Sequence, residues 1–186
     1  MRRDNKEYEN ISKIIIDIYL DYDIKSFPID EKEVCEKLGI VLVPYSETDD
    51  EMKELLFKKS KLGSFWKRTK EYKSTIYYND RINSKGSMRF TIFHEIKHYV
   101  FEDESDENDD LADFFARYFM CPIPYLMLKG IHSPNEIVSH CGVSLEAAKY
   151  VAENILNRRR IYGNKIFDYE IKLIEHLDPV LLELIK

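Results

Sequence analysis

The chain of 186 residues is long enough to bury one well-packed domain, and 44% hydrophobic with 13% aromatic content supports a substantial core. This composition excludes disorder of the whole chain, and a net charge of −6 argues against a general coat for nucleic acids. The first residues lead into no long apolar run, so the sequence predicts neither a signal peptide nor a membrane span.

The three cysteines, Cys35, Cys121 and Cys141, lie far apart in the sequence and form no Cys-x-x-Cys pair. An odd number of isolated cysteines favours neither a disulfide framework nor a thiolate zinc site. Each has apolar neighbours and is expected to be a small buried hydrophobic residue. These features predict a protein of the reducing cytoplasm.

The first half of the chain predicts helices followed by strands. Apolar residues recur at helical spacing over residues 8–22, and a second helix is expected over 31–38. Asp30 is the expected N-cap of that helix, and Gly39 its C-terminal stop. The expected strands are Ile40–Tyr45, Gly63–Lys67 and Ser74–Tyr78, the last two as a pair. The segment between the first and second strands is ambiguous, with a short helix as one interpretation.

The second half of the chain is predicted to be helical. A helix over 84–101 is followed by an acidic run, residues 102–107, and then by a helix over 108–121. Two or three further helices are expected up to about residue 157, followed by three consecutive arginines. A last stretch with helical periodicity covers 166–185.

These elements predict the α+β class, with a small three-stranded sheet backed by helices and a helical C-terminal part. We expect one domain over residues 1–122 and a helical region over 123–186 packed on it. Neither an internal repeat nor a low-complexity linker divides the chain.

The expected helix over 84–101 carries a His-Glu-x-x-His motif, made by His94, Glu95 and His98. On a helix the two histidines differ by about 40° around the axis and about 6 Å along it, so both can reach one metal ion. Most of this helix is apolar, so its polar sector is expected to face the interior, where imidazoles need partners. The alternative is two hydrogen-bonded core histidines, but the pairing with Glu95 favours a hydrolytic zinc site in which Glu95 is catalytic.

A catalytic zinc site requires one more protein ligand and an open position for water. On the next helix Asp109 adjoins an apolar face that contains Ala112 and Ala116. These small side chains would let the motif helix approach closely, so Asp109 is the predicted third metal ligand. The neighbouring acidic run is expected to be a solvated loop, with its acids as alternative ligands. Asp113, one turn later, is expected to accept the ring N–H of a ligating histidine, although both aspartates could simply complement the helix dipole.

Two stretches, Arg89–His98 and Ala112–Pro122, resemble the core motifs of the ImmA/IrrE family of bacterial metallopeptidases. The resemblance extends from about residue 8 to about residue 157. The chain departs from the family pattern at Asp109, where the family usually supplies a Glu, which is longer by one methylene group.

The resemblance implies a zincin-type peptidase, gluzincin-like, that cleaves a helix-turn-helix transcriptional repressor of a phage, a mobile element or a stress-response locus. Residues 1–122 would then be the zinc metallopeptidase domain, with manganese as an alternative metal. In this mechanism His94, His98 and Asp109 hold the metal, and Glu95 takes the proton as metal-bound water attacks the scissile carbonyl. The implied partner is a protein substrate, and the oligomeric state is not predicted.

A second interpretation comes from residues 133–151, which resemble a helix-turn-helix with Gly142 in the turn and Ser144 as the next N-cap. The rival function is therefore a DNA-binding regulator whose metal site is structural or inactive. The second helix presents Glu146 and Glu153 beside a single lysine, a weak basis for phosphate contact, although the following arginines partly restore it. The unit is expected instead to serve packing or substrate docking, with direct DNA binding as the alternative.

Overall fold

The computed structural model describes residues 5–82, 84–103 and 109–184, and the chain forms two compact units. One unit is formed by residues 30–116, and the other by residues 1–29 together with 117–186. The chain is mostly helical with a three-stranded sheet, as the α+β prediction requires. Among the helices described, none has both the length and the apolar character needed to cross a membrane.

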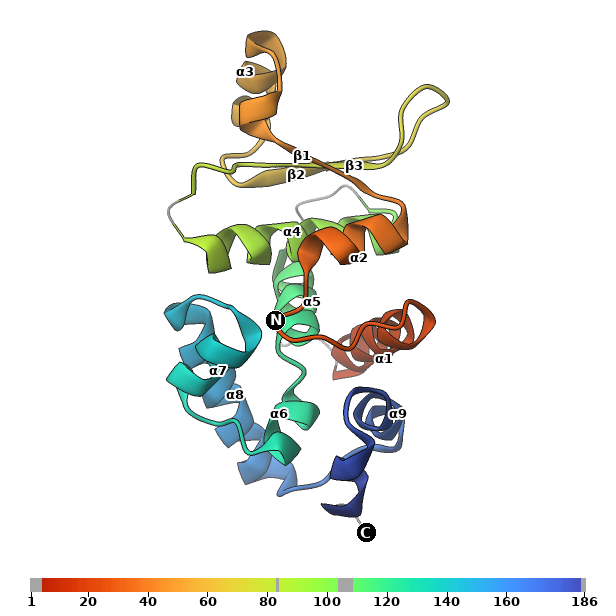
Figure 1. Ribbon diagram of the computed structural model, residues 1–186, viewed down its shortest axis with the longest axis vertical. Helices are drawn as coiled ribbons and strands as arrows, with labels where there is room; N and C mark the ends of the chain where they lie inside the picture. The colour runs from red at the N-terminus through yellow and green to blue at the C-terminus, as the bar shows by residue number, and fades with distance from the viewer. Residues whose placement is uncertain (1–4, 83, 104–108, 185–186) are drawn as a thin grey trace. The chain divides into compact units, whose positions relative to one another are not determined.

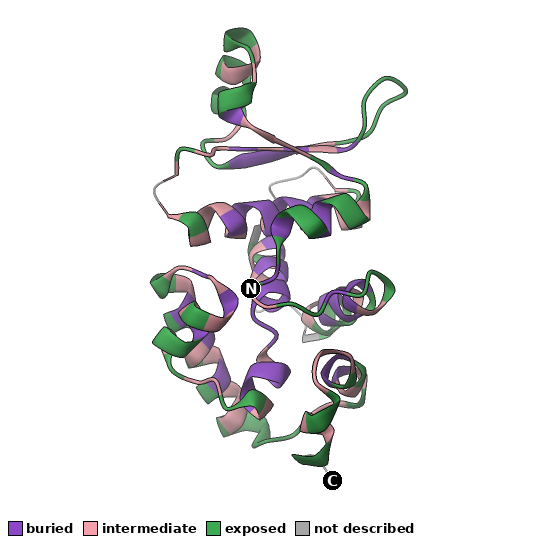
Figure 2. Ribbon diagram, viewed as in Figure 1, coloured by how far each residue is buried: buried purple, intermediate pink, exposed green. Residues whose placement is uncertain are grey.

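The unit of residues 30–116 contains the sheet (Figure 1). Its elements in chain order are α2 (Glu31–Leu38), β1 (Val41–Pro44), the 3-10 turn Tyr45–Glu47, α3 (Asp50–Lys59), β2 (Gly63–Trp66), β3 (Thr75–Tyr78), α4 (Lys85–Phe101) and the first two turns of α5 (Asp109–Met120). Helix α3 and the loop between β2 and β3 are largely exposed, whereas α5 is largely buried (Figure 2).

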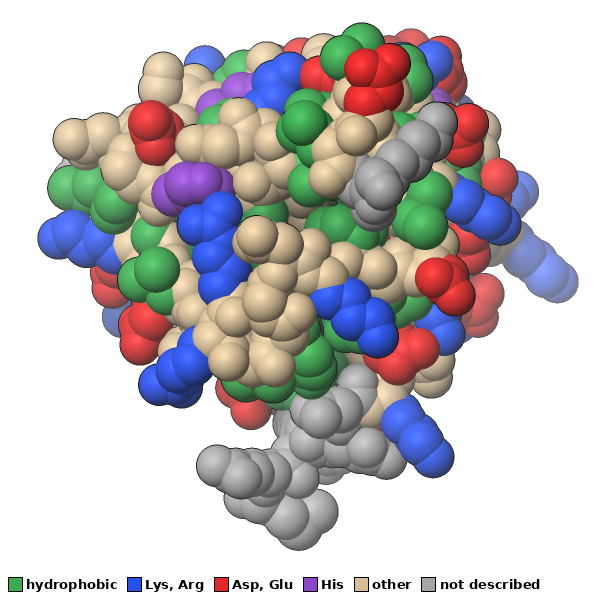
Figure 3. Space-filling view, turned by 90° about the horizontal axis from the view of Figure 1, so that it is seen from below, with side chains coloured by type: hydrophobic (Ala, Val, Ile, Leu, Met, Phe, Trp, Pro, Cys, Tyr) green, Lys and Arg blue, Asp and Glu red, His purple; other side chains and the backbone are tan. Residues whose placement is uncertain are grey.

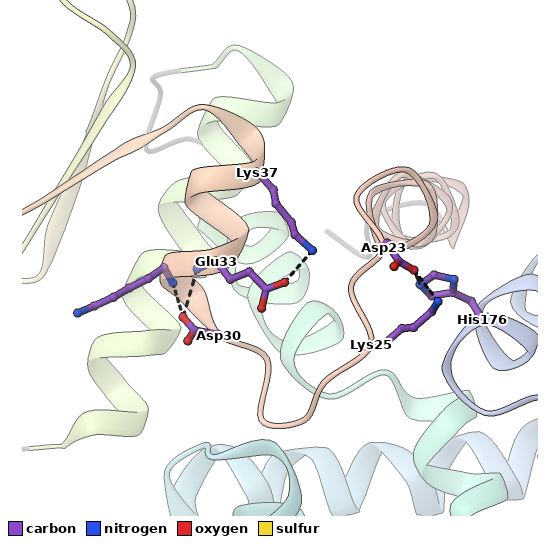
Figure 4. A network of polar contacts seen from close by, with 7 residues as sticks. Asp23, Lys25, Asp30, Glu33, Lys37 and His176 are labelled. Carbon is purple, nitrogen blue, oxygen red and sulfur yellow. Dashed lines mark hydrogen bonds and ion pairs between the residues drawn. The ribbon is translucent and has the colours of Figure 1, made fainter.

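Helix α2 begins and ends at the predicted residues because both of its ends are capped. The Asp30 side chain accepts hydrogen bonds from the backbone N–H groups of Lys32 and Glu33, at 2.8 and 3.2 Å (Figure 4). At the other end Gly39 adopts the left-handed conformation, with φ of 73°, and its N–H bonds to the carbonyls of the last turn. Both predicted capping residues are confirmed.

The sheet has the order β1-β3-β2, with β3 in the centre. Strand β1 pairs with β3 in parallel, placing Leu42 beside Ile76, and β2 pairs with β3 antiparallel, placing Phe65 beside Ile76. The predicted pairing of the second and third strands is confirmed. Ile76 is fully buried at the middle of the sheet, so the side chains on this face form its packed side.

Helix α4 lies next to β2 and β3 and carries the histidine motif. Its N-cap is Ser84, whose hydroxyl accepts from the backbone N–H of Ser87. In its second turn the buried Arg89 donates from Nε to Glu31 of α2 at 2.8 Å, and both side chains are almost inaccessible. This ion pair ties α2 to the helix that carries the motif.

The other unit contains helices and no strand among its described residues. Its elements are α1 (Asn5–Asp21), the last turn of α5, α6 (Ile123–Lys129), α7 (Pro134–Cys141), α8 (Leu145–Tyr162), α9 (Asp168–Leu177) and a 3-10 segment, Pro179–Leu184. Helix α9 packs against α1 and α6, and α7 packs against α8. An ion pair of Asp23 with Lys25 lies at the end of α1, near His176 of α9 (Figure 4).

The turn between α7 and α8 has the predicted chemistry. Gly142 adopts a left-handed conformation with φ of 65°, and Ser144 caps α8 by accepting from the backbone N–H of Ala147. Helix α8, however, continues to Tyr162, about one turn beyond the expected end near residue 157. The three arginines therefore lie inside this helix rather than after it, because they are good helix formers and residues 145–162 contain neither Gly nor Pro.

Candidate active site

The three motif residues line one pocket of the unit formed by residues 30–116. One wall is helix α4 with His94, Glu95 and His98, and the opposite wall is the end of α3 and strand β2. The cavity volume is about 480 Å³, which is within the range of sites that hold a small ligand or a few residues of a peptide. The remaining lining residues are Lys59, Ser60, Leu62, Gly63, Ser64, Phe65, Phe90, Thr91 and Asp113.

Each motif histidine has a carboxylate beside its Nδ1 atom. His94 Nδ1 lies 3.0 Å from Asp113 Oδ1, which confirms the contact predicted for Asp113 from the phase of α5. His98 Nδ1 lies 2.6 Å from Asp103 Oδ1. A carboxylate at Nδ1 fixes the orientation of an imidazole and makes Nε2 the nitrogen that ligates a metal.

Glu95 is buried between the helix and the strand, and its Oε2 accepts a hydrogen bond of 2.8 Å from the backbone N–H of Phe65. Burial raises the pKa of Glu95 above its ordinary value, while His94, His98 and the Phe65 N–H act in the opposite direction. A carboxylate whose pKa is raised toward neutrality is a better general base than an exposed one. The environment of Glu95 therefore suits proton transfer.

Residues 35–153 match the family model of the IrrE N-terminal-like domain, peptidase family M78. The chain belongs to this family. The resemblance inferred from the two core motifs is thus confirmed, and the family indicates a peptidase that uses a metal cofactor. Among curated proteins no significant match was found.

The two histidines fit the metal that the M78 family implies. Their ring centroids lie 5.3 Å apart. Two imidazoles that bind one zinc ion at tetrahedral angles, with Zn–N of about 2.0–2.1 Å, have centroids about 5.2 Å apart. The spacing of the rings and the carboxylates at both Nδ1 atoms therefore suit a shared ion.

The third ligand predicted for this site is Asp109. Among the residues that the structure describes, no group of three or more His, Cys, Asp or Glu could hold a metal. Asp109 begins helix α5, but its side chain lies outside the described part of the chain, as do residues 104–108 of the acidic run. The prediction of Asp109 as a ligand stays a prediction.

The close approach of β2 to helix α4 depends on Gly63. A Cβ atom at this position would lie 2.6 Å from Thr91 Cγ2, 3.2 Å from the Tyr77 carbonyl oxygen and 3.5 Å from Glu95 Cγ. Such short distances exclude a side chain unless the strand or the helix moves. The strand therefore reaches Glu95 only because residue 63 is a glycine.

We expect Gly63→Ala to lower the free energy of unfolding by about 1–3 kcal/mol, because the added methyl overpacks the contact with Thr91. Denaturant titration measures the loss. The double variant Gly63→Ala/Thr91→Ser should recover part of it, since serine lacks the Cγ2 methyl and keeps the hydroxyl that bonds to the Ser87 carbonyl. Wild-type stability in Gly63→Ala would contradict the close packing.

Two partners of the motif escaped sequence reasoning. Asp103 belongs to the acidic run of residues 102–107, which the sequence predicts to be a solvated loop or a source of alternative ligands. In the structure one of its oxygens lies beside His98, and the other accepts from Lys97 Nζ at 2.6 Å. The Phe65 amide was missed because a backbone donor has no sequence signature. One signal was present for Asp103, namely a lysine inside an apolar helix, which requires a nearby acid when buried.

Proposed function

We propose that this chain is a zinc-dependent endopeptidase that cleaves a helix-turn-helix transcriptional repressor. The observation that carries the proposal is the joint placement of Glu95 and two carboxylate-supported histidines in one pocket. Membership of the M78 peptidase family supports the reaction class. The repressor as substrate rests on the motif resemblance described above.

In the proposed mechanism His94, His98 and Asp109 would hold the metal. When bound, the metal supplies a Lewis acid that lowers the pKa of water and polarises the scissile carbonyl. Glu95 accepts the proton of the attacking water and then delivers it to the departing amine. The Phe65 N–H keeps one Glu95 oxygen fixed at the strand, and the other oxygen is the one assigned to proton transfer.

Asp109→Ala should raise the dissociation constant for Zn²⁺ by more than about 100-fold, because it removes a direct ligand. Asp110→Ala, a change to the exposed neighbour in the same turn of α5, should leave zinc affinity unchanged. Competition with a chromophoric chelator measures both variants. If the two variants bind Zn²⁺ with equal affinity, Asp109 is not the third ligand, and an acid of residues 104–108 takes its place in the proposal.

The substrate proposal predicts that a small helix-turn-helix repressor is encoded beside the gene for this chain, and that repressor is the substrate to test. Zinc-loaded protein should cut this repressor at a single peptide bond, and an unrelated protein such as casein should stay intact. Mass spectrometry of the products identifies the bond. Zinc-loaded protein that leaves the repressor intact would overturn the substrate assignment.

The rival function, DNA binding through α7 and α8, is supported less well. Arg158, one of the three arginines that could contact phosphate, is committed to Glu170 through two hydrogen bonds. On the face shown in Figure 3, basic and acidic side chains are interspersed, and no large basic area forms. We therefore assign the helical region over 123–186 to packing or substrate docking.

A further inference from the structure

Lys97 is a buried cation next to a proposed metal ligand. Only 1% of the residue is exposed, and it lies in the last turns of α4, directly before His98. Its ammonium donates to Asp103 Oδ2 at 2.6 Å and lies 5.6 Å from the centre of the Phe101 ring. A buried ammonium needs such a partner, because an unpaired buried charge is strongly destabilising.

The backbone at the end of α4 returns Asp103 to the histidine. Glu102 adopts the left-handed conformation, with φ of 52°, and the N–H of Asp103 then bonds to the His98 carbonyl at 3.2 Å. This reversal places the carboxylate between Lys97 and the His98 ring.

The chemistry of the three groups restricts the position of the imidazole proton. An ammonium can only donate, so Oδ2 of Asp103 must accept from Lys97. An ionised carboxylate can only accept, so Oδ1 requires a donor at the facing Nδ1 of His98. A neutral His98 must then carry its proton on Nδ1, and its Nε2 becomes the unprotonated nitrogen.

We propose that Lys97 and Asp103 together fix the tautomer of His98 and so prepare its Nε2 for a metal ion. Asp103 is a positioning residue that acts through His98, and Lys97 orients Asp103. The metal-binding part of this inference rests on the proposed function. The tautomer, in contrast, is a property of the metal-free protein.

Asp103→Asn tests the contribution of Lys97. The amide has one acceptor oxygen and one donor group, and the ammonium of Lys97 must take the oxygen. The NH₂ group then faces Nδ1 of His98, which must accept, so the proton moves to Nε2. In Lys97→Met/Asp103→Asn the amide can turn and present its oxygen to Nδ1, so the double variant regains the tautomer that the single variant loses.

The tautomer is measured by the imidazole ¹⁵N chemical shifts of His98 in the metal-free full chain above the pH at which the ring titrates. We expect protonated Nδ1 in wild type, in Lys97→Met and in the double variant, and protonated Nε2 in Asp103→Asn. Protonated Nε2 in the wild type would overturn the proposal without any variant. The same tautomer in Asp103→Asn and the double variant would overturn it as well.

Zinc affinity provides a second readout that does not depend on peptidase activity. Asp103→Asn should weaken Zn²⁺ binding about 10–100-fold, and the double variant should recover most of this loss. Equal losses in the two variants would show a merely structural role, and denaturant titration checks that each is folded. Failure of the proposed function looks different, because a wild type with the expected tautomer and tight zinc binding would then leave the repressor uncut.

Discussion

Glu95→Gln is expected to lower kcat/KM for repressor cleavage by about 10²–10⁴-fold while the protein still binds zinc. The amide of glutamine cannot take a proton from water, but its oxygen can still accept from the Phe65 N–H. The histidines and their carboxylates are unchanged by the substitution. Loss of activity with retained metal therefore isolates proton transfer from metal binding. Both quantities are measured on one zinc-loaded preparation, by product formation and by metal analysis.

Glu102→Gln is the matched control for this prediction. Glu102 is exposed at the end of the same helix, and its side chain forms an ion pair with the exposed Lys67, at 3.3 Å. The same chemical change at this position should leave cleavage at the wild-type rate. A Glu95→Gln protein as active as the control would remove Glu95 from the mechanism.

Glu170→Ala is expected to lower the free energy of unfolding by about 3–5 kcal/mol, because it leaves the Arg158 guanidinium buried without its carboxylate. Glu170 is completely buried, and its two oxygens accept from the two terminal nitrogens of Arg158 at 2.9 and 2.6 Å. The same carboxylate also accepts from the backbone N–H of Phe167, just before α9. The loss is measured by denaturant titration followed by circular dichroism.

An exposed ion pair in the same unit provides the comparison. Glu9 and Lys13 lie one turn apart on α1, with 48% and 46% of their side chains accessible. Glu9→Ala should cost less than about 1 kcal/mol, since water screens this pair and solvates the remaining lysine. Equal losses of unfolding free energy for Glu9→Ala and Glu170→Ala would mean that burial does not determine how much the ion pair of Arg158 with Glu170 contributes to stability.

The elements that the sequence predicted well are those determined by local chemistry. Asp30 and Gly39 act on backbone groups within one turn, so their spacing alone gives the bounds of α2. The pairing of β2 with β3 also follows from neighbouring segments. The parallel pairing of β1 with β3 depends on which distant segments meet, and no local pattern encodes it.

In the candidate site, too, local sequence predicts some contacts, and others depend on tertiary structure. The motif histidines and Asp113 follow from helical phase, since residues four apart share a face. Asp103 reaches His98 only because the backbone reverses at Glu102, a non-glycine residue with positive φ that sequence reasoning does not expect. The contact of Phe65 with Glu95 depends on how closely a strand and a helix approach, which tertiary packing decides.

The hydrogen bond from Phe65 to Glu95 also affects how the sheet meets other molecules. Strands β1 and β2 are the edge strands of the sheet. The unpaired backbone groups of an edge strand can form hydrogen bonds with a strand of another chain. In β1, Pro44 has no backbone N–H. In β2, the backbone N–H of Phe65 already donates to Glu95. The carboxylate assigned to catalysis thus also occupies a backbone donor that a strand added at β2 would need.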